Sequence, residues 1–153
     1  MRAVAYQTSL PIEERESLLD IDLPRPAPGP RDLLVKIRAI SVNPVDTKVR
    51  MRAEPAPGGW KVLGWDAVGT VEAVGSDVTL FAPGDEVFYA GALERPGTNA
   101  EYHLVDERIV GRKPETITHA EAAALPLTTL TAWEALFDRL DVRRPVEGAA
   151  PAI

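Results

Sequence analysis

Val62-Leu63-Gly64-Trp65-Asp66-Ala67-Val68-Gly69-Thr70-Val71-Glu72-Ala73-Val74-Gly75 is the stretch of sequence that decides the fold of this chain. It is mostly apolar, and successive side chains of a strand alternate between the two faces of a sheet. Gly69 inside this run indicates a bulge, a sharp bend or the close approach of another backbone. We therefore expect one long, bent strand.

Turn signals follow this strand. Gly75-Ser76-Asp77 is the first, and Pro83-Gly84-Asp85 is the second, because glycine and proline favour the backbone angles of tight turns. The apolar residues 86–89 come directly after the second turn and read as another strand. This order of a glycine-rich strand, a turn and a further strand predicts one edge of a small bent β-barrel.

Composition limits the class of protein. The chain has 153 residues, enough for one domain with a core, and its 14 prolines are about twice the usual share of roughly 5%. It has no cysteine, which excludes disulfides and thiolate metal sites. The net charge is −6 and the basic residues are scattered, so nothing predicts nucleic-acid or anionic-membrane binding. No segment is long and apolar enough to span a bilayer, and the N-terminus does not resemble a signal peptide, so we expect a cytoplasmic protein.

The remaining strands are read from their apolar patterns. The stretch 32–42 is the longest candidate after the opening stretch. Alternating prolines at 24–30 forbid a helix and indicate an extended connector between two strands. We expect strands at 2–6, 18–23, 32–42, 99–105 and 109–110.

Three helices are expected. Asn43 is a suitable N-cap, with Pro44 in the first helical position and Asp46 in the third, so a short helix should cover about 44–50. Thr118 and Glu121 fit a capping box, which predicts a helix that Pro126 ends. An amphipathic helix over 127–140 follows from the three- and four-residue spacing of Leu130, Trp133, Leu136, Phe137 and Leu140.

Five of these segments, in this order and over nearly the whole chain, resemble the catalytic domain of the medium-chain dehydrogenase/reductase superfamily. The most similar branch contains the quinone oxidoreductases and the zinc-type alcohol dehydrogenase-like proteins, in which Asn-Pro-Val-Asp is usual. The segments that carry the resemblance are Ser41-Val42-Asn43-Pro44-Val45-Asp46, Gly64-Trp65-Asp66-Ala67-Val68-Gly69, Pro83-Gly84-Asp85-Glu86-Val87, Asn99-Ala100-Glu101-Tyr102 and Ala122-Ala123-Ala124-Leu125-Pro126-Leu127-Thr128.

The resemblance implies a mainly β fold with flanking helices, a GroES-like, partly open β-barrel that forms one wall of a cleft. It implies NADPH as the hydride donor and a quinone, enone or other carbonyl compound as the small-molecule acceptor. Residues 1–125 would be the catalytic domain. Residues 126–153 would be a helix and linker that lead toward a Rossmann cofactor domain, since this chain has no glycine-rich dinucleotide-binding turn of its own.

The chain departs from the zinc-dependent members of the superfamily. They have a cysteine at the position of Asn43 and a His-Glu pair at Trp65-Asp66, and their four-cysteine lobe would fall near 90–98. Zinc takes about three or four ligands of Cys, His or carboxylate type. Because neither His103 nor His119 is at a matching position, we expect no zinc.

The resemblance also suggests site residues, each with a structural alternative. Asn43 would face the nicotinamide and, with Asp46, would be catalytic, but both could simply cap a helix. Lys48 reaches the cleft or lies in solvent. Trp65 lines the substrate pocket or belongs to the core. Thr131 lies near the nicotinamide or is bonded back to its own helix.

Asp66, also assigned to the substrate pocket, lies in an apolar run and needs a partner if it is buried. We expect that partner to be Lys48, Arg50 or Arg52, or a residue outside this chain.

The apolar stripe on the helix over 127–140 is wide. We expect the chain either to form a homo-oligomer through it or to leave the residues after about 140 disordered, and the alternative is that the helix folds back onto its own barrel as a monomer. A different class of function stays open at this stage. A GroES-like barrel could be a stand-alone structural or interaction module.

Overall fold

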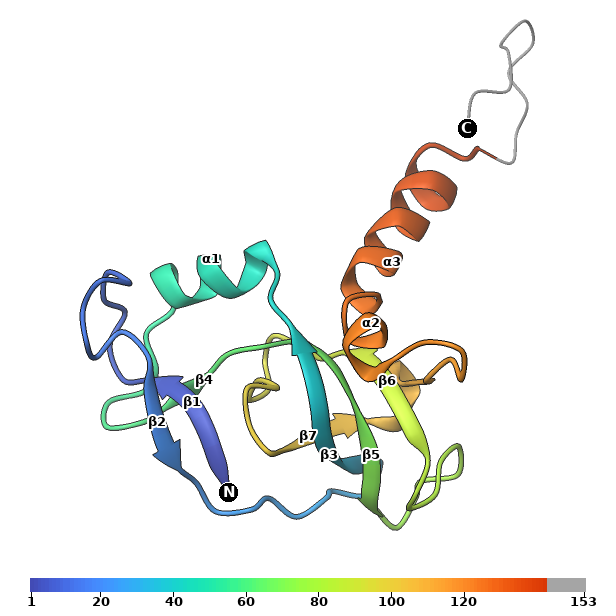
Figure 1. Cartoon of the computed structure of the whole chain (residues 1–153), viewed down its shortest axis with the longest axis horizontal. Helices are drawn as coiled ribbons and strands as arrows, with labels where there is room; N and C mark the ends of the chain where they lie inside the picture. The colour runs from blue at the N-terminus through green and yellow to red at the C-terminus, as the bar shows by residue number, and fades with distance from the viewer. Residues whose placement is uncertain (143–153) are drawn as a thin grey trace, which may run out of the picture.

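Two antiparallel sheets build the barrel in the computed structural model, which describes residues 1–142 (Figure 1). The larger sheet has five strands with the long strand β5 (Asp66–Val74) at its centre. Its order is β7 (Tyr102–Asp106), β3 (Asp32–Ser41), β5, β6 (Glu86–Ala90) and β8 (Gly111–Arg112). The smaller sheet has the order β2 (Leu19–Asp22), β1 (Arg2–Tyr6) and β4 (Lys61–Val62).

The main core lies inside the larger sheet, where the inward rows of β3, β5, β6 and β7 meet. Its members are almost wholly apolar and fully or nearly fully buried, and each buried valine or leucine among them contributes roughly 1.5–3 kcal/mol of hydrophobic stabilisation. They are Leu33, Val35, Ala67, Val71, Val87, Tyr89 and Val105. The alternation read from the sequence of 32–42 and 62–75 therefore predicts which side chains build this core.

Gly69 is the position at which β5 comes closest to another strand. A Cβ built there would lie 2.3 Å from the carbonyl oxygen of Lys36, too close for any other residue. The pairing of β3 with β5 shifts register between Ile37 and Ala39, opposite Gly69. Of the alternatives predicted from this glycine, the bulge and the close backbone approach are confirmed.

The helices begin where the sequence predicts. Asn43 precedes α1 (Pro44–Arg52), which is two residues longer than expected, and Thr118 caps α2 (His119–Ala123). The Thr118 side chain accepts the Glu121 N–H while the Glu121 carboxylate accepts the Thr118 N–H, which confirms the capping box.

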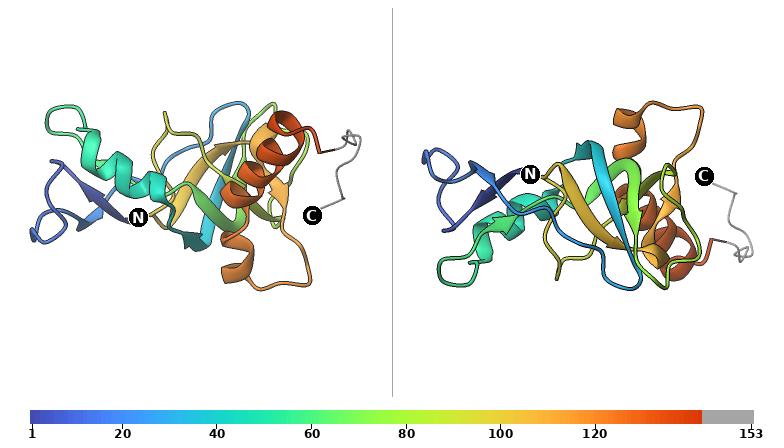
Figure 2. Two further views of the ribbon diagram at one scale, coloured as in Figure 1. Left: turned by 90° about the horizontal axis from the view of Figure 1, so that it is seen from above. Right: turned by 90° about the horizontal axis from the view of Figure 1, so that it is seen from below.

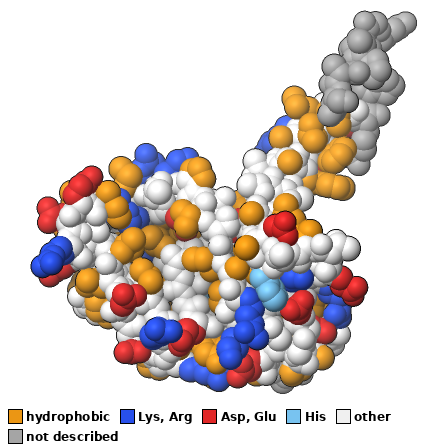
Figure 3. Space-filling view, in the orientation of Figure 1, with side chains coloured by type: hydrophobic (Ala, Val, Ile, Leu, Met, Phe, Trp, Pro, Cys, Tyr) orange, Lys and Arg blue, Asp and Glu red, His pale blue; other side chains and the backbone are white. Residues whose placement is uncertain are grey.

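The third helix changes type along its length. α3 (Pro126–Trp133) continues as the π-helix η2 (Glu134–Arg139), and the two together project from the barrel as an arm (Figures 1 and 2). Leu130, Trp133 and Leu140 are 53%, 58% and 70% exposed, and apolar side chains are visible along the arm in Figure 3. The stripe therefore stays a predicted interface. The linker expected at the end of 126–153 lies outside the described residues.

Two expected strands differ in the structure. The strand predicted at 99–105 begins only at Tyr102, because residues 99–101 bond to two different strands. The Val4 N–H donates to Asn99 O and the Ile37 N–H donates to Glu101 O, so this segment bridges the two sheets.

The strand predicted at 109–110 is replaced by the 3-10 turn η1 (Glu107–Ile109), followed by β8. This turn buries the Glu107 carboxylate, which accepts the N–H groups of Thr79 and Leu80 and a hydrogen bond from Arg31. Satisfying that carboxylate requires the chain to turn where the sequence pattern indicates a strand. Within residues 1–142, no helix combines the length and apolar character that crossing a membrane requires.

His103 is a buried titratable group of the larger sheet and is 4% exposed. Its Nδ1 lies 3.0 Å from the Tyr89 hydroxyl and its Nε2 lies 2.9 Å from Pro96 O. A neutral ring satisfies both contacts if Nε2–H donates to the carbonyl and Nδ1 accepts from the hydroxyl. Burial is the main cause that lowers the pKa of His103 to about 4.

We predict that the protein loses stability as the pH falls from about 6.5 to about 4. The unfolded chain takes up a proton at His103 in this window and the folded chain does not, so the free energy of unfolding decreases, by about 3 kcal/mol in total. Urea unfolding at several pH values measures this loss. His103→Gln should flatten the dependence. An unaltered pH profile in His103→Gln would contradict this account.

Candidate functional site

The candidate site lies where β3 ends and β5 begins. Ser41 at the end of β3 pairs with Asp66 at the start of β5. α1 starts two residues beyond β3, and the first residues of α3 lie against the same end of the sheet. Three elements thus bring Asn43, Asp66 and Leu127 together, although they are far apart in the sequence.

The Asp66 carboxylate is the centre of this cluster and is fully buried. Asn43 Nδ2 donates to its Oδ2 at 2.9 Å, and the Leu127 N–H donates to its Oδ1 at 2.9 Å. Burial raises the pKa of Asp66, the two hydrogen bonds act against this rise, and the nearby Asp46 carboxylate adds to it. Both oxygens are therefore held in place by donors from different elements.

The hydrogen-bond partners of Asp66 among the described residues are not the cations named from the sequence, and a partner from outside this chain stays a prediction. Lys48 is exposed, and Arg50 donates to Leu10 O at 2.6 Å. The partner is instead an amide side chain and a backbone N–H near the N-terminus of α3, where the free N–H groups and the helix dipole favour a negative charge. A pattern of charged residues does not reveal a backbone donor supplied by a segment 61 residues away.

Asn43 and Asp46 form the start of α1. Asn43 is the N-cap residue, and its N–H donates to Asp46 Oδ2 at 2.7 Å. Asp46 Oδ1 is buried and has no hydrogen-bond partner among the described residues. The Asn43 side chain therefore points to Asp66 while its backbone is fixed by the helix, so its amide is held from two sides.

The other predicted site residues have the following surroundings. Trp65 is 2% exposed and packs with Tyr6 and Leu63, and its indole N–H donates to Ala92 O at 3.2 Å. Thr131 is exposed on α3, and its hydroxyl donates to Leu127 O at 2.9 Å. Neither touches Asn43 or Asp66 through a hydrogen bond, so the core and back-bonded alternatives describe their contacts in this chain.

The donor set does not fit zinc. Asn43 and Trp65 occupy the expected ligand positions, and the Asn43 nitrogen is used in a bond to Asp66. In the part of the chain that the structure describes, no three histidines or carboxylates gather in a way that could hold a metal ion. Two carboxylates, Asp46 and Asp66, fall short of the three or four ligands that zinc takes.

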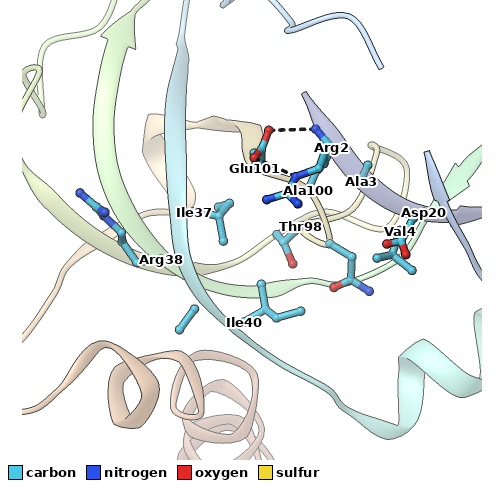
Figure 4. Close-up of a pocket in the computed structure, with 12 residues that line it drawn as sticks. Arg2, Ala3, Val4, Asp20, Ile37, Arg38, Ile40, Thr98, Ala100 and Glu101 are labelled. Carbon is cyan, nitrogen blue, oxygen red and sulfur yellow. Dashed lines mark hydrogen bonds and ion pairs between the residues drawn. The ribbon is translucent and has the colours of Figure 1, made fainter. Parts of the chain in front are cut away.

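An open groove of about 440 Å³ runs beside the site, between β1 and β3 (Figure 4). Ile37 and Ile40 of β3 point into it, and residues 98–101 cross its floor. The Thr98 hydroxyl donates to the backbone carbonyl oxygen of Asp66 at 3.4 Å, which links the groove to the main chain at the start of β5. The sequence does not single out Thr98 or this groove, because Thr98 lies at the end of the expected loop over 90–98 and belongs to no motif.

The geometry defines a GroES-like barrel with a polar cluster at one end. The sequence profile of the alcohol dehydrogenase GroES-like domain matches residues 29–115. The chain belongs to this family and, with it, to the medium-chain dehydrogenase/reductase superfamily.

Individual relatives agree with this membership. A zinc-type alcohol dehydrogenase-like protein of Staphylococcus aureus strain Mu50 is 46% identical over all of this chain and 45% of its own length. A crystal structure from Rhizobium etli CFN 42, described as a zinc-dependent alcohol dehydrogenase, is 67% identical with a TM-score of 0.94, over 99% of this chain and 44% of that one. Escherichia coli quinone oxidoreductase in complex with NADPH is 26% identical with a TM-score of 0.78, over 92% and 41%. The chain thus spans less than half the length of these relatives.

We predict that Asn43→Ala lowers the free energy of unfolding by about 1–3 kcal/mol, because it leaves a buried carboxylate with one donor fewer. The loss should be largest near neutral pH and should shrink as Asp66 takes up a proton at lower pH, since the lost bond supports the ionised form. Urea unfolding measures both effects. Gln7→Ala, at an exposed amide, should change stability by less than about 0.5 kcal/mol. Equal losses in the two variants would mean that the Asn43–Asp66 bond has no special weight.

Proposed function

We propose that residues 1–125 are the catalytic domain of an NADPH-dependent oxidoreductase that acts in the cytoplasm, and that 126–153 lead toward a cofactor domain. The substrate would be a quinone, an enone or another carbonyl compound. The observation that carries this proposal is the Asn43–Asp66–Leu127 cluster, in which a buried carboxylate holds the Asn43 amide in place.

The relatives support the reaction class. One is a quinone oxidoreductase solved with NADPH, and the others bear alcohol dehydrogenase-type names. Every strand pair among the described residues is antiparallel, so residues 1–142 contain no parallel βαβ unit for a dinucleotide. This chain would therefore contribute the nicotinamide and substrate side of a shared cleft. NADPH, when bound, supplies the hydride.

In this proposal, Asn43 orients the reactants. Asp66 binds one N–H of the Asn43 amide, which leaves the second N–H for a substrate carbonyl or for the nicotinamide carboxamide. Asp46 and the N-terminus of α1 hold the backbone of the same residue. A positioned donor of this kind stabilises charge that develops on the carbonyl oxygen during reduction.

The proposed substrates suit a site without a metal. In an enone or quinone, conjugation spreads the developing negative charge, so fewer electrostatic groups are needed than for a simple ketone. Lys48, Trp65 and Thr131 would contribute to the cleft once a second domain closes it. The final proton would come from water, because among the described residues we find no convincing general acid beside Asn43.

We predict that the protein retains no stoichiometric zinc, because Asn43 and Trp65 replace the ligands and the described residues offer no third carboxylate or histidine. Metal analysis after dialysis against a chelator measures the content. About one retained zinc per chain would overturn this prediction. Unfolding with and without added zinc is a second measurement, and we expect identical midpoints.

A chimaera tests the proposed function. We would join this chain to the remaining part of the Rhizobium etli relative, whose matching segment is 67% identical. We expect NADPH oxidation with quinone or enone acceptors, and we expect Asn43→Ala to lower kcat/KM by at least about tenfold through the lost hydrogen bond. The 153-residue chain alone should be inactive and should bind NADPH weakly or not at all.

Gln7→Ala in the chimaera is the matched control and should retain the parental rate. A folded chimaera that binds NADPH but reduces none of these acceptors would contradict the proposal and favour a structural or interaction module. Micromolar NADPH binding by the isolated chain would show that the barrel holds more of the cofactor than we propose.

A further inference from the structure

A second cavity, of about 400 Å³, lies away from the Asn43–Asp66 cluster. It is formed by the connection from β2 to β3, by residues 95–97 and by β7. Figure 2, right, shows the N-terminus, this connection and β7 on the face that is seen from below. The volume is within the range of small-molecule sites, roughly 300–1,000 Å³.

The interior of this cavity is apolar. The apolar residues that line it are Leu23, Pro24, Pro26, Val62, Pro96 and Leu104. His103 also lines it, but both ring nitrogens are engaged by Tyr89 and Pro96, so the ring offers no free polar group. A ligand would therefore place an apolar body here.

Two guanidinium groups belong to the same wall. Arg25 donates to Glu72 at 2.6 Å and lies 4.1 Å from the centre of the Tyr102 ring. Arg95 donates to both carboxylate oxygens of Asp32, at 2.8 and 2.9 Å. Both ion pairs involve surface-accessible groups, and the two side chains are 43% and 32% exposed, so the cations lie where the cavity meets solvent.

The acidic partners do not belong to this wall. Glu72 and Asp32 are not among the residues that line the cavity. The cavity wall therefore contains the two guanidinium groups but not the carboxylates paired with them. Within residues 1–142, Arg25 uses only Nη2 and Arg95 uses only its two Nη groups in hydrogen bonds. The Nε–H groups and Arg25 Nη1–H thus remain as donors, and guanidinium donors match carboxylate oxygens well.

We propose that this cavity binds a small amphipathic carboxylate, with its apolar body between Leu23, Val62 and Leu104 and its carboxylate at Arg25 and Arg95. The apolar interior excludes a strongly polar ligand, because it could not replace the hydrogen bonds that such a ligand loses on leaving water. The cationic opening favours an anion over a neutral amphiphile. The site is independent of the proposed reductase function, and it shares only Ala100 with the groove beside Asp66.

Octanoate is the probe for this site, and octanol is its neutral counterpart. Titration of the 153-residue chain followed by ¹⁵N–¹H NMR should shift the amides of Tyr102, His103 and Leu104 with octanoate. We expect octanol to bind at least tenfold more weakly. Shifts confined to Trp133 and its neighbours would instead show non-specific binding to the exposed arm and would overturn the proposal.

Arg25→Met removes a positive charge at the opening of the cavity and leaves the hydrophobic core intact. We expect it to weaken octanoate at least tenfold. Arg112→Met is a matched control, because Arg112 also pairs with a carboxylate, Asp85, and lies 5.3 Å from an aromatic ring, that of Phe81, yet it does not line this cavity. It should change affinity by less than twofold. Equal weakening in both variants would show a general charge effect and would contradict the proposed site.

Leu104→Trp tests the apolar interior. Its larger side chain should fill the cavity and abolish octanoate binding, while thermal unfolding reports whether the fold is retained. If a folded Leu104→Trp variant binds octanoate as the parent does, the carboxylate lies elsewhere and the proposal fails. If this variant does not fold, Arg25→Met and its control decide the question alone.

Discussion

The buried carboxylate of Asp66 is the interaction on which the arrangement of this end of the molecule depends. It costs several kcal/mol to remove a lone carboxylate from water, and only donors on both oxygens offset that cost. Asn43 and the Leu127 N–H supply them, from the end of β3 and the start of α3. One side chain therefore fixes the positions of β5, α1 and α3 relative to each other, and the candidate site exists because these three elements meet.

Much of the fold could be predicted from the sequence because its signals are local. Alternating apolar residues place β3 and β5, Gly69 marks the close approach of two strands, and Thr118 starts α2. The wrong strand predictions arise where hydrogen bonds to residues distant in the sequence determine the local structure. Residues 99–101 bond to β1 and β3 instead of extending β7, and Glu107 turns the chain to reach two N–H groups. No local pattern contains that information.

The candidate site, like the fold, could be predicted from the sequence only in part. The resemblance singled out Asn43, Asp46 and Asp66, and the structure brings these residues together. The second partner of Asp66, the Leu127 N–H, was not predictable, because a backbone N–H has no signature in a sequence. Thr98 has a plain polar side chain in a loop, and only the fold shows that it connects Asp66 to a groove. The roles of Lys48, Trp65 and Thr131 stay predictions.

The bond from Leu127 to Asp66 also determines where the molecule can flex. A rotation of the arm about its first turn would pull the Leu127 N–H away from the fully buried Asp66 carboxylate. The first turn of α3 is therefore held rigidly against the barrel. Compliance is left to the wider-wound turns of η2, which have fewer constraints from the barrel and the looser geometry of a π-helix. Bending of the arm would thus occur beyond Trp133. The Asn43 amide would keep its orientation while the direction of the far end of the arm changes.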